Sequence, residues 1–204
     1  SYVLPALNPN NSYYTATNGG GTMLNPGDVI TSSQTIYVWA QTGTTPNCTD
    51  ESSFNVTINT TPVVAPISNV TACDSYTLPA LAVGNYYTAP NGGGTMLTAG
   101  TVITTSQTLY VYASTGTTPN CSDEESFTVT INSINAQTLS NVTVCDSYVL
   151  PALNPNNNYY TAPNGGGTML TAGTSISTSQ TIYIWAQTGT TPNCTDESSF
   201  TVTV

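Results

Sequence analysis

The sequence contains no lysine, no arginine and no histidine among its 204 residues. Its ten charged side chains are all acidic, which gives a formal net charge of −10 at pH 7. Phosphate binding depends on Lys and Arg, so the composition excludes a nucleic-acid partner. An anionic membrane surface would repel this chain, and no apolar run approaches the roughly 18 residues of a membrane span. We therefore expect no direct membrane insertion.

The missing basic residues also argue against catalysis. A nucleophilic cysteine needs a neighbouring cation or base that lowers its pKa, and the chain has none. A structural zinc site needs CxxC or histidine spacing, which is also absent. Paired carboxylates can hydrolyse glycosides, but here they recur in the same context three times, whereas an active site is normally built once. We expect that the protein is not an enzyme.

Helix signals are scarce, because no apolar period of 3.6 residues lasts two turns. Tyr, Val, Ile and Thr are abundant instead, and these residues favour strands. Five cysteines in such a chain suggest an oxidising compartment. The composition predicts an all-β, extracellular protein.

One unit occurs three times. The stretch TGTTPNCTDESSF at 42–54 returns letter for letter at 188–200, and TGTTPNCSDEESF stands between them at 115–127. The spacing is 73 residues, as the positions of Cys48, Cys121 and Cys194 show. We predict a first repeat at 1–58 that lacks its opening strand, a second at 59–131 and a third at 132–204, each of the last two with its connector.

The middle copy carries strand and turn signals throughout. NVTACDSYTLP is an extended opening segment, GNYYTAP a short strand and NGGGT a turn in which Asn and Gly accept positive φ. TLYVYA and SFTVTI alternate, so that Leu109, Val111 and Phe127 face one side while Tyr110 and Tyr112 face the other. About 73 residues with this many short strands predict a small immunoglobulin-like β-sandwich, and three copies predict a tandem array.

These motifs together resemble a known family. The segments concerned are CDSYTLPAL, GNYYTA, GGGT, ITTSQTLYVYA and TGTTPNC followed by DE and SFTV. Together they resemble the tandem immunoglobulin-like repeats of giant cell-surface proteins of gliding and related Bacteroidota. The similarity covers essentially the whole chain. It implies export by the type IX secretion system, a cell-surface location and a role in cell adhesion or as a filament stalk.

The cysteines fall into two classes, CDSY at the opening of a repeat and PNC in the later loop. A sandwich commonly places its opening strand beside its closing strand, which favours the pairs Cys73–Cys121 and Cys145–Cys194 within repeats. The alternative joins neighbouring repeats, as Cys48–Cys73 and Cys121–Cys145. In the first case, the partner of Cys48 is missing from the chain.

Acidic residues follow both classes of cysteine and no base neutralises them. Calcium takes six to eight oxygen ligands, including carbonyl groups, so the carboxylates are calcium candidates, although hydrated surface is the stronger interpretation. These candidates are Asp74, Asp123, Glu124, Asp146, Asp196 and Glu197. We expect no other cofactor.

Aromatic side chains recur on one face of corresponding strands, and they either cover the sheet or form an exposed patch. They are Tyr37, Trp39, Tyr110, Tyr112, Tyr183 and Trp185. The resulting hypothesis is a non-catalytic structural segment of a surface filament or adhesin stalk, whose partners are other repeats or neighbouring chains. One alternative is an array of carbohydrate-binding modules that contacts surface glycans. Another is a subunit of a strand-exchanged polymeric fibre.

Overall fold

The computed structural model describes all residues from 1 to 204, and the chain is built of strands without a helix. It follows that no helix long and apolar enough to cross a membrane is present. The chain forms two compact units, one of residues 1–63 with 114–123 and the other of 64–113 with 124–204. The predicted all-β class is confirmed.

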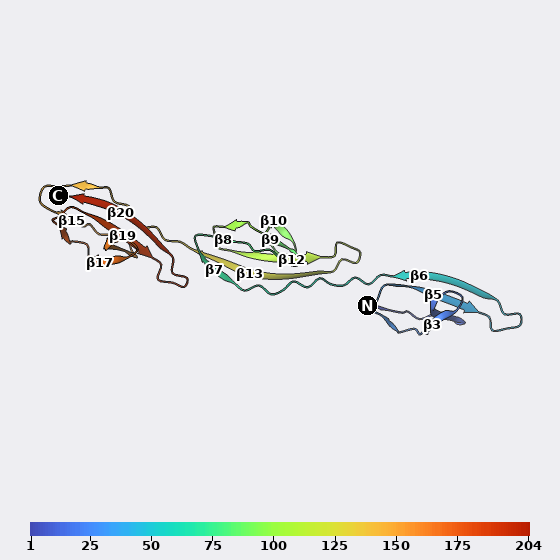
Figure 1. Ribbon diagram of the computed structural model, residues 1–204. Coiled ribbons are helices and arrows are strands. Elements are labelled where there is room, and N and C mark those ends of the chain that lie inside the picture. The colour runs from blue at the N-terminus through green and yellow to red at the C-terminus, as the bar shows by residue number, and fades with distance from the viewer. The chain divides into compact units, whose positions relative to one another are not determined.

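The first repeat has six strands in two sheets, and Figure 1 labels β3, β5 and β6 of its larger sheet. A four-stranded sheet has the order β3-β2-β5-β6, and β1 pairs with β4 in a second sheet. The strands are β1 (Tyr2–Val3), β2 (Asn11–Ala16), β3 (Gly20–Leu24), β4 (Val29–Ile30), β5 (Gln34–Gln41) and β6 (Thr49–Val56).

The second and third repeats have the same plan with one strand more. Their larger sheets run β10-β9-β12-β13-β7 and β17-β16-β19-β20-β14, and the pairs β8-β11 and β15-β18 form the small sheets. The second repeat contains β7 (Val70–Cys73), β8 (Tyr76–Thr77), β9 (Asn85–Ala89), β10 (Gly93–Leu97), β11 (Val102–Ile103), β12 (Gln107–Ser114) and β13 (Ser122–Asn132). The third contains β14 (Val142–Thr143), β15 (Tyr148–Val149), β16 (Asn157–Ala162), β17 (Gly166–Leu170), β18 (Ser175–Ile176), β19 (Gln180–Gln187) and β20 (Thr195–Thr203).

Each repeat encloses its own hydrophobic core between its two sheets. In the second repeat, Leu109, Val111 and Phe127 of the large sheet pack with Ile103 of the small sheet. Tyr110 and Tyr112 point away from this core and are only partly buried. The alternation predicted from TLYVYA is therefore confirmed, and each repeat is a small β-sandwich of immunoglobulin-like type. Three separate cores account for the three-fold sequence period.

The opening strand of a repeat pairs with the closing strand in the parallel direction. Val70 of β7 lies opposite Val129 of β13, and Cys73 lies opposite Asn132. In the third repeat β14 pairs with β20 in the same way. The first repeat has no such strand, and the outer edge of β6 is left without a partner.

The NGGG segments form turns, as predicted, with positive φ at Asn91 and Gly92 in the second repeat. The strand that follows each turn was not predicted. In the second repeat this is β10, which starts with two glycines and pairs with β9 through an irregular register. Its Met96 is 54% exposed, so the segment lacks the alternation that reveals a half-buried strand.

A buried tyrosine ties the start of each repeat to the sandwich. The hydroxyl of Tyr159 donates a hydrogen bond to the Pro151 carbonyl (3.1 Å), and Tyr13 and Tyr86 make the equivalent bonds. Burial raises the pKa of all three hydroxyls, and for Tyr159 burial together with the nearby Tyr148 raises it to about 12.

This shift predicts an alkaline limit of stability. The unfolded chain releases the tyrosine proton near the ordinary tyrosine pKa of 10.0, while the folded chain retains it. The contribution is therefore complete below pH 10 and is lost as the pH rises toward 12. We expect the free energy of unfolding, measured with urea, to fall across this window. The fall should be smaller in Tyr159→Phe, and an equal fall in both proteins would contradict the assignment.

Candidate functional site

The segment TGTTPNC forms a closed loop before the last strand of every repeat. In the third repeat the Thr188 amide donates to the Cys194 carbonyl (2.9 Å), and the Cys194 amide donates to the Thr188 hydroxyl (2.9 Å). The Gly189 amide donates to the side-chain oxygen of Asn193 (2.8 Å). The same three bonds occur at 42–48 and at 115–121. The loop therefore fixes the position of its cysteine with its own polar groups.

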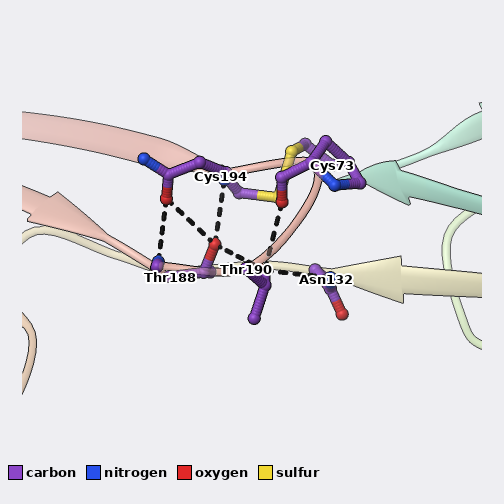
Figure 2. Close-up of a disulfide and its surroundings, with 8 residues drawn as sticks. Cys73, Asn132, Thr188, Thr190 and Cys194 are labelled. Atoms are coloured by element: carbon purple, nitrogen blue, oxygen red, sulfur yellow. Dashed lines mark hydrogen bonds between the residues drawn. A yellow bond between two sulfur atoms is a disulfide. The ribbon is translucent and has the colours of Figure 1, made fainter.

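A disulfide joins the opening cysteine of the second repeat to the loop cysteine of the third (Figure 2). The Cα atoms of Cys73 and Cys194 are 5.4 Å apart, and the two residues are separated by 121 positions in the sequence. Asn132, at the end of β13, donates a side-chain hydrogen bond to the Thr190 hydroxyl (3.4 Å). The Asn132 carbonyl also accepts the amide of Asp74 (2.9 Å). The bond from Asn132 to Thr190 thus links the same two repeats as the disulfide, whereas the bond from Asp74 to Asn132 lies within the second repeat.

The predicted pairs Cys73–Cys121 and Cys145–Cys194 are wrong, and neither cross-junction pair forms. The reason is the parallel direction of the opening strand. Cys121 stands just before β13, whereas Cys73 lies opposite the last residue of that strand. An 11-residue strand is about 36 Å long, and a disulfide needs Cα atoms within about 7 Å. Cys48, Cys121 and Cys145 are unbonded.

The first compact unit repeats the environment of the bridge around Cys121. Asn59, which lies one period before Asn132, donates to the Thr117 hydroxyl and to the Pro119 carbonyl, both at 2.7 Å. The Cys121 sulfur is 3.9 Å from the Asn59 carbonyl oxygen. The asparagine and threonine that surround the disulfide are therefore also present at Cys121, without the second cysteine.

The acidic residues accept hydrogen bonds from backbone amides. Glu124 accepts the amide of Asn91 at the start of the NGGG turn, and Glu51 and Glu197 do the same in their repeats. Asp196 accepts the amide of Ala136 in the connector (2.8 Å). In a chain without basic side chains, these bonds place carboxylates where the backbone offers partial positive charge.

The structure brings together no group of three or more His, Cys, Asp or Glu side chains that could hold a metal. Asp74 lies at the bridge with a positive φ of 61°, and Asp146 follows the unbonded Cys145. A calcium site would therefore have to draw most of its ligands from carbonyl and amide oxygens. Calcium binding stays a prediction.

The recurrent aromatic side chains lie on the outer face of each large sheet and are all partly buried. The side chain of Trp39 lies against Gly19 of the NGGG turn, where a Cβ atom would come within 3.3 Å of the ring. Tyr112 and Trp185 lie against Gly92 and Gly165 in the same way. Tyr37 is paired across the strands with Tyr14, and the other repeats have the same tyrosine pair. The aromatics thus cover the sheet and its turn.

Sequence reasoning missed the two asparagines that line the cysteine sites. Asn59 and Asn132 stand one period apart, each just after a closing segment, and this recurrence was the available signal. Their role depends on which loop meets the end of the closing strand. The spacing within one repeat does not contain that information.

No protein-family model matches the chain, and no curated protein matches it. Among solved structures, it is similar over 100% of its length to a protocadherin gammaB7 EC3-6 cis-dimer structure, with 11% identity and a TM-score of 0.32. It is similar to protocadherin gamma B2 domains 3-6 over 99% (11%, 0.35) and to mouse cadherin-23 EC22-24 over 99% (10%, 0.27). It spans 66% of each protocadherin chain and 89% of the cadherin-23 chain. Similarity this weak carries no argument about function.

The disulfide predicts a specific digestion pattern. Unbonded thiols are first blocked with iodoacetamide, and the chain is then cleaved after Glu124 or Glu125. The fragments that contain Cys73 and Cys194 should remain joined until a reductant is added, with Cys48, Cys121 and Cys145 alkylated. If the two fragments separate without a reductant, the disulfides lie within repeats and the structure is contradicted. If the fragments stay joined but Cys73 is alkylated, another pair of cysteines joins them, and this would also contradict the structure.

The bond between Glu124 and the turn predicts a difference between two adjacent acids. Glu124→Gln removes a charged acceptor from the Asn91 amide, and we expect unfolding of the second repeat to become easier by about 1 kcal/mol. Glu125→Gln is the matched control, because it removes the same charge and makes no contact with the turn amide. Urea unfolding measures both, and equal effects would mean that charge alone is responsible.

Proposed function

We propose that the chain is a non-catalytic, extracellular structural segment of a surface fibre or adhesin stalk. The observation that carries this proposal is the Cys73–Cys194 bridge, which joins one β-sandwich to its successor. A bridge within a sandwich would stabilise that sandwich alone. A bridge between successive sandwiches gives the fibre a covalent connection besides the backbone.

The placement of the remaining cysteines supports an array of such bridges. Cys145 is the opening cysteine of the third repeat and lies, in sequence, inside the loop closed by Cys73 and Cys194. If Cys145 joins a loop cysteine one repeat further on, the two closed loops overlap. Every peptide bond from Cys73 to that further loop cysteine then lies inside at least one loop that a disulfide closes. A single proteolytic cut in this stretch therefore leaves the fibre joined.

The setting of this fibre follows from the resemblance. Giant surface proteins of gliding and related Bacteroidota, exported by type IX secretion, are the proposed context for the chain. The absence of Lys and Arg supports an external role, because trypsin-like proteases find no site for cleavage. The proposed partners are other repeats and neighbouring chains of the same fibre.

Two alternative functions each relate to a specific feature of the structure. The open edge of β6 in the first repeat favours a fibre whose subunits exchange strands. Glycan contact would use the outer face of each large sheet, where the partly buried tyrosine pairs lie beside the exposed Met23, Met96 and Met169. Both alternatives are compatible with a structural segment that performs no chemistry.

Mechanical extension of the chain tests the proposal. When the two termini are pulled apart, the residues between Cys73 and Cys194 cannot extend until the bridge is reduced. At about 3.5 Å per residue, the fully unfolded oxidised chain should be shorter than the reduced chain by about 400 Å. The double variant Cys73→Ser/Cys194→Ser is the control and should show one length under both conditions. Equal lengths of the oxidised and reduced natural chain would contradict a bridge that carries force.

A further inference from the structure

The first repeat has a surface that the other two repeats cover. In the third repeat the connector and opening strand lie along the sandwich, where Leu139 packs against the core and Ala136 is buried. In the second repeat, Val64 and Ile67 occupy the corresponding positions. The first repeat has no such segment, and its larger sheet ends at β6.

The consequence is visible in the exposure of equivalent side chains. Phe200 is 1% exposed, and Ile184 and Ala186 are completely buried. Their equivalents in the first repeat are Phe54, Val38 and Ala40, and all three are only partly buried. We call the surface formed by Val38, Ala40, Phe54 and the free edge of β6 the acceptor groove.

Polar groups along the groove also lack the partners that they have in the third repeat. There, Asp196 accepts the Ala136 amide, Ser198 donates to the Gln137 carbonyl (2.6 Å) and Asn157 accepts the Gln137 amide (2.8 Å). The corresponding residues of the first repeat are chemically identical. They are Asp50, Ser52 and Asn11. Asn11, Ala40 and Asp50 line an open pocket of about 230 Å³ at this place.

The groove ends at a thiol. A strand that paired with the first repeat as β7 pairs with β13 would lie opposite Val56, Thr57, Ile58 and Asn59, and its cysteine would lie opposite Asn59. In the bonded case Asn132 holds Thr190 of the loop that carries Cys194. Asn59 holds Thr117 of the loop that carries Cys121. The missing cysteine would therefore arrive beside Cys121.

We propose that the acceptor groove binds an extended strand of the type Ala-Gln-Thr-Leu-Ser-Asn-Val-Thr-Val-Cys and that its cysteine forms a disulfide with Cys121. The occupant needs apolar side chains at every third position, as at Ala136, Leu139 and Val142, with the cysteine three residues further on. The chain supplies this pattern twice, at 64–73 and at 136–145. The proposal rests on the structural function proposed above and names the partner of the open edge.

The covalent step is a thiol–disulfide exchange. The Cys121 thiolate attacks the sulfur of a strand cysteine that is held in a disulfide with a small thiol such as glutathione. The new bond joins Cys121 to the strand, the old bond breaks, and the small thiol leaves as a thiolate. The same pairing would join Cys145, the opening cysteine of the third repeat, to a loop cysteine of another repeat. It would join Cys48, the loop cysteine of the first repeat, to an opening cysteine of another repeat.

A synthetic peptide with the sequence of residues 135–145, carried as its glutathione disulfide, tests the proposal on the full chain. Cys48→Ser and Cys145→Ser leave Cys121 as the reactive thiol. We expect the peptide to couple to Cys121 about ten-fold or more faster than a scrambled peptide with its cysteine at the same end, because docking raises the local concentration of the reacting sulfur. Intact mass measured over time gives both rates.

A second readout separates docking from thiol chemistry. The peptide with its cysteine replaced by serine should slow hydrogen exchange of the amides at 55–59, and the peptide with both Leu139 and Val142 replaced by Ser should not. Equal coupling rates together with unchanged exchange would overturn the proposal. Dimers of this variant joined through Cys121 on both chains, formed without any peptide, would also overturn it, because the thiol would then pair with a second Cys121 and not with a strand cysteine. The extension experiment depends on Cys73 and Cys194, so either test can fail without the other.

Discussion

The parallel pairing of each opening strand with the closing strand of its repeat determines how the chain is cross-linked. Because β7 and β13 run in the same direction, the cysteine that ends β7 lies at the far end of the sandwich from the loop of its own repeat. It is the loop of the following repeat that reaches it. An antiparallel opening strand would have placed both cysteines of a repeat together. The direction of this strand therefore determines whether disulfides form within each domain or join successive domains of a fibre.

The contacts of the acidic and polar side chains show how the fold is held without basic residues. A chain without basic residues cannot use ion pairs between side chains, and its carboxylates instead accept backbone amides, as Glu124 does at the turn and Asp196 does at the connector. Asparagine and threonine hold the cysteine loops. Junctions are stabilised by hydrogen bonds and disulfides, which do not depend on pairing opposite charges and are weakly affected by salt.

Much of the fold could be predicted because local patterns encode it. Alternation in TLYVYA and SFTVTI identifies the inward residues, and Asn-Gly segments identify the turns. Alternation does not reveal whether two strands run parallel or antiparallel, so the cysteine pairs were assigned wrongly. The strand from Gly93 to Leu97 was missed because its glycines and exposed Met96 give no two-residue period. The roles of Asn59 and Asn132 arise from contacts between segments about 58 residues apart, which a single-repeat pattern cannot contain.

The most direct test of the covalent junction is the intact mass of a variant in which Cys48, Cys121 and Cys145 are all replaced by serine. Only Cys73 and Cys194 then remain, in different repeats. After expression in an oxidising compartment, the folded protein should be lighter than its reduced form by two hydrogen atoms and should resist alkylation. Two freely alkylated cysteines in the folded monomer would show that the opening strand does not carry its cysteine to the next repeat.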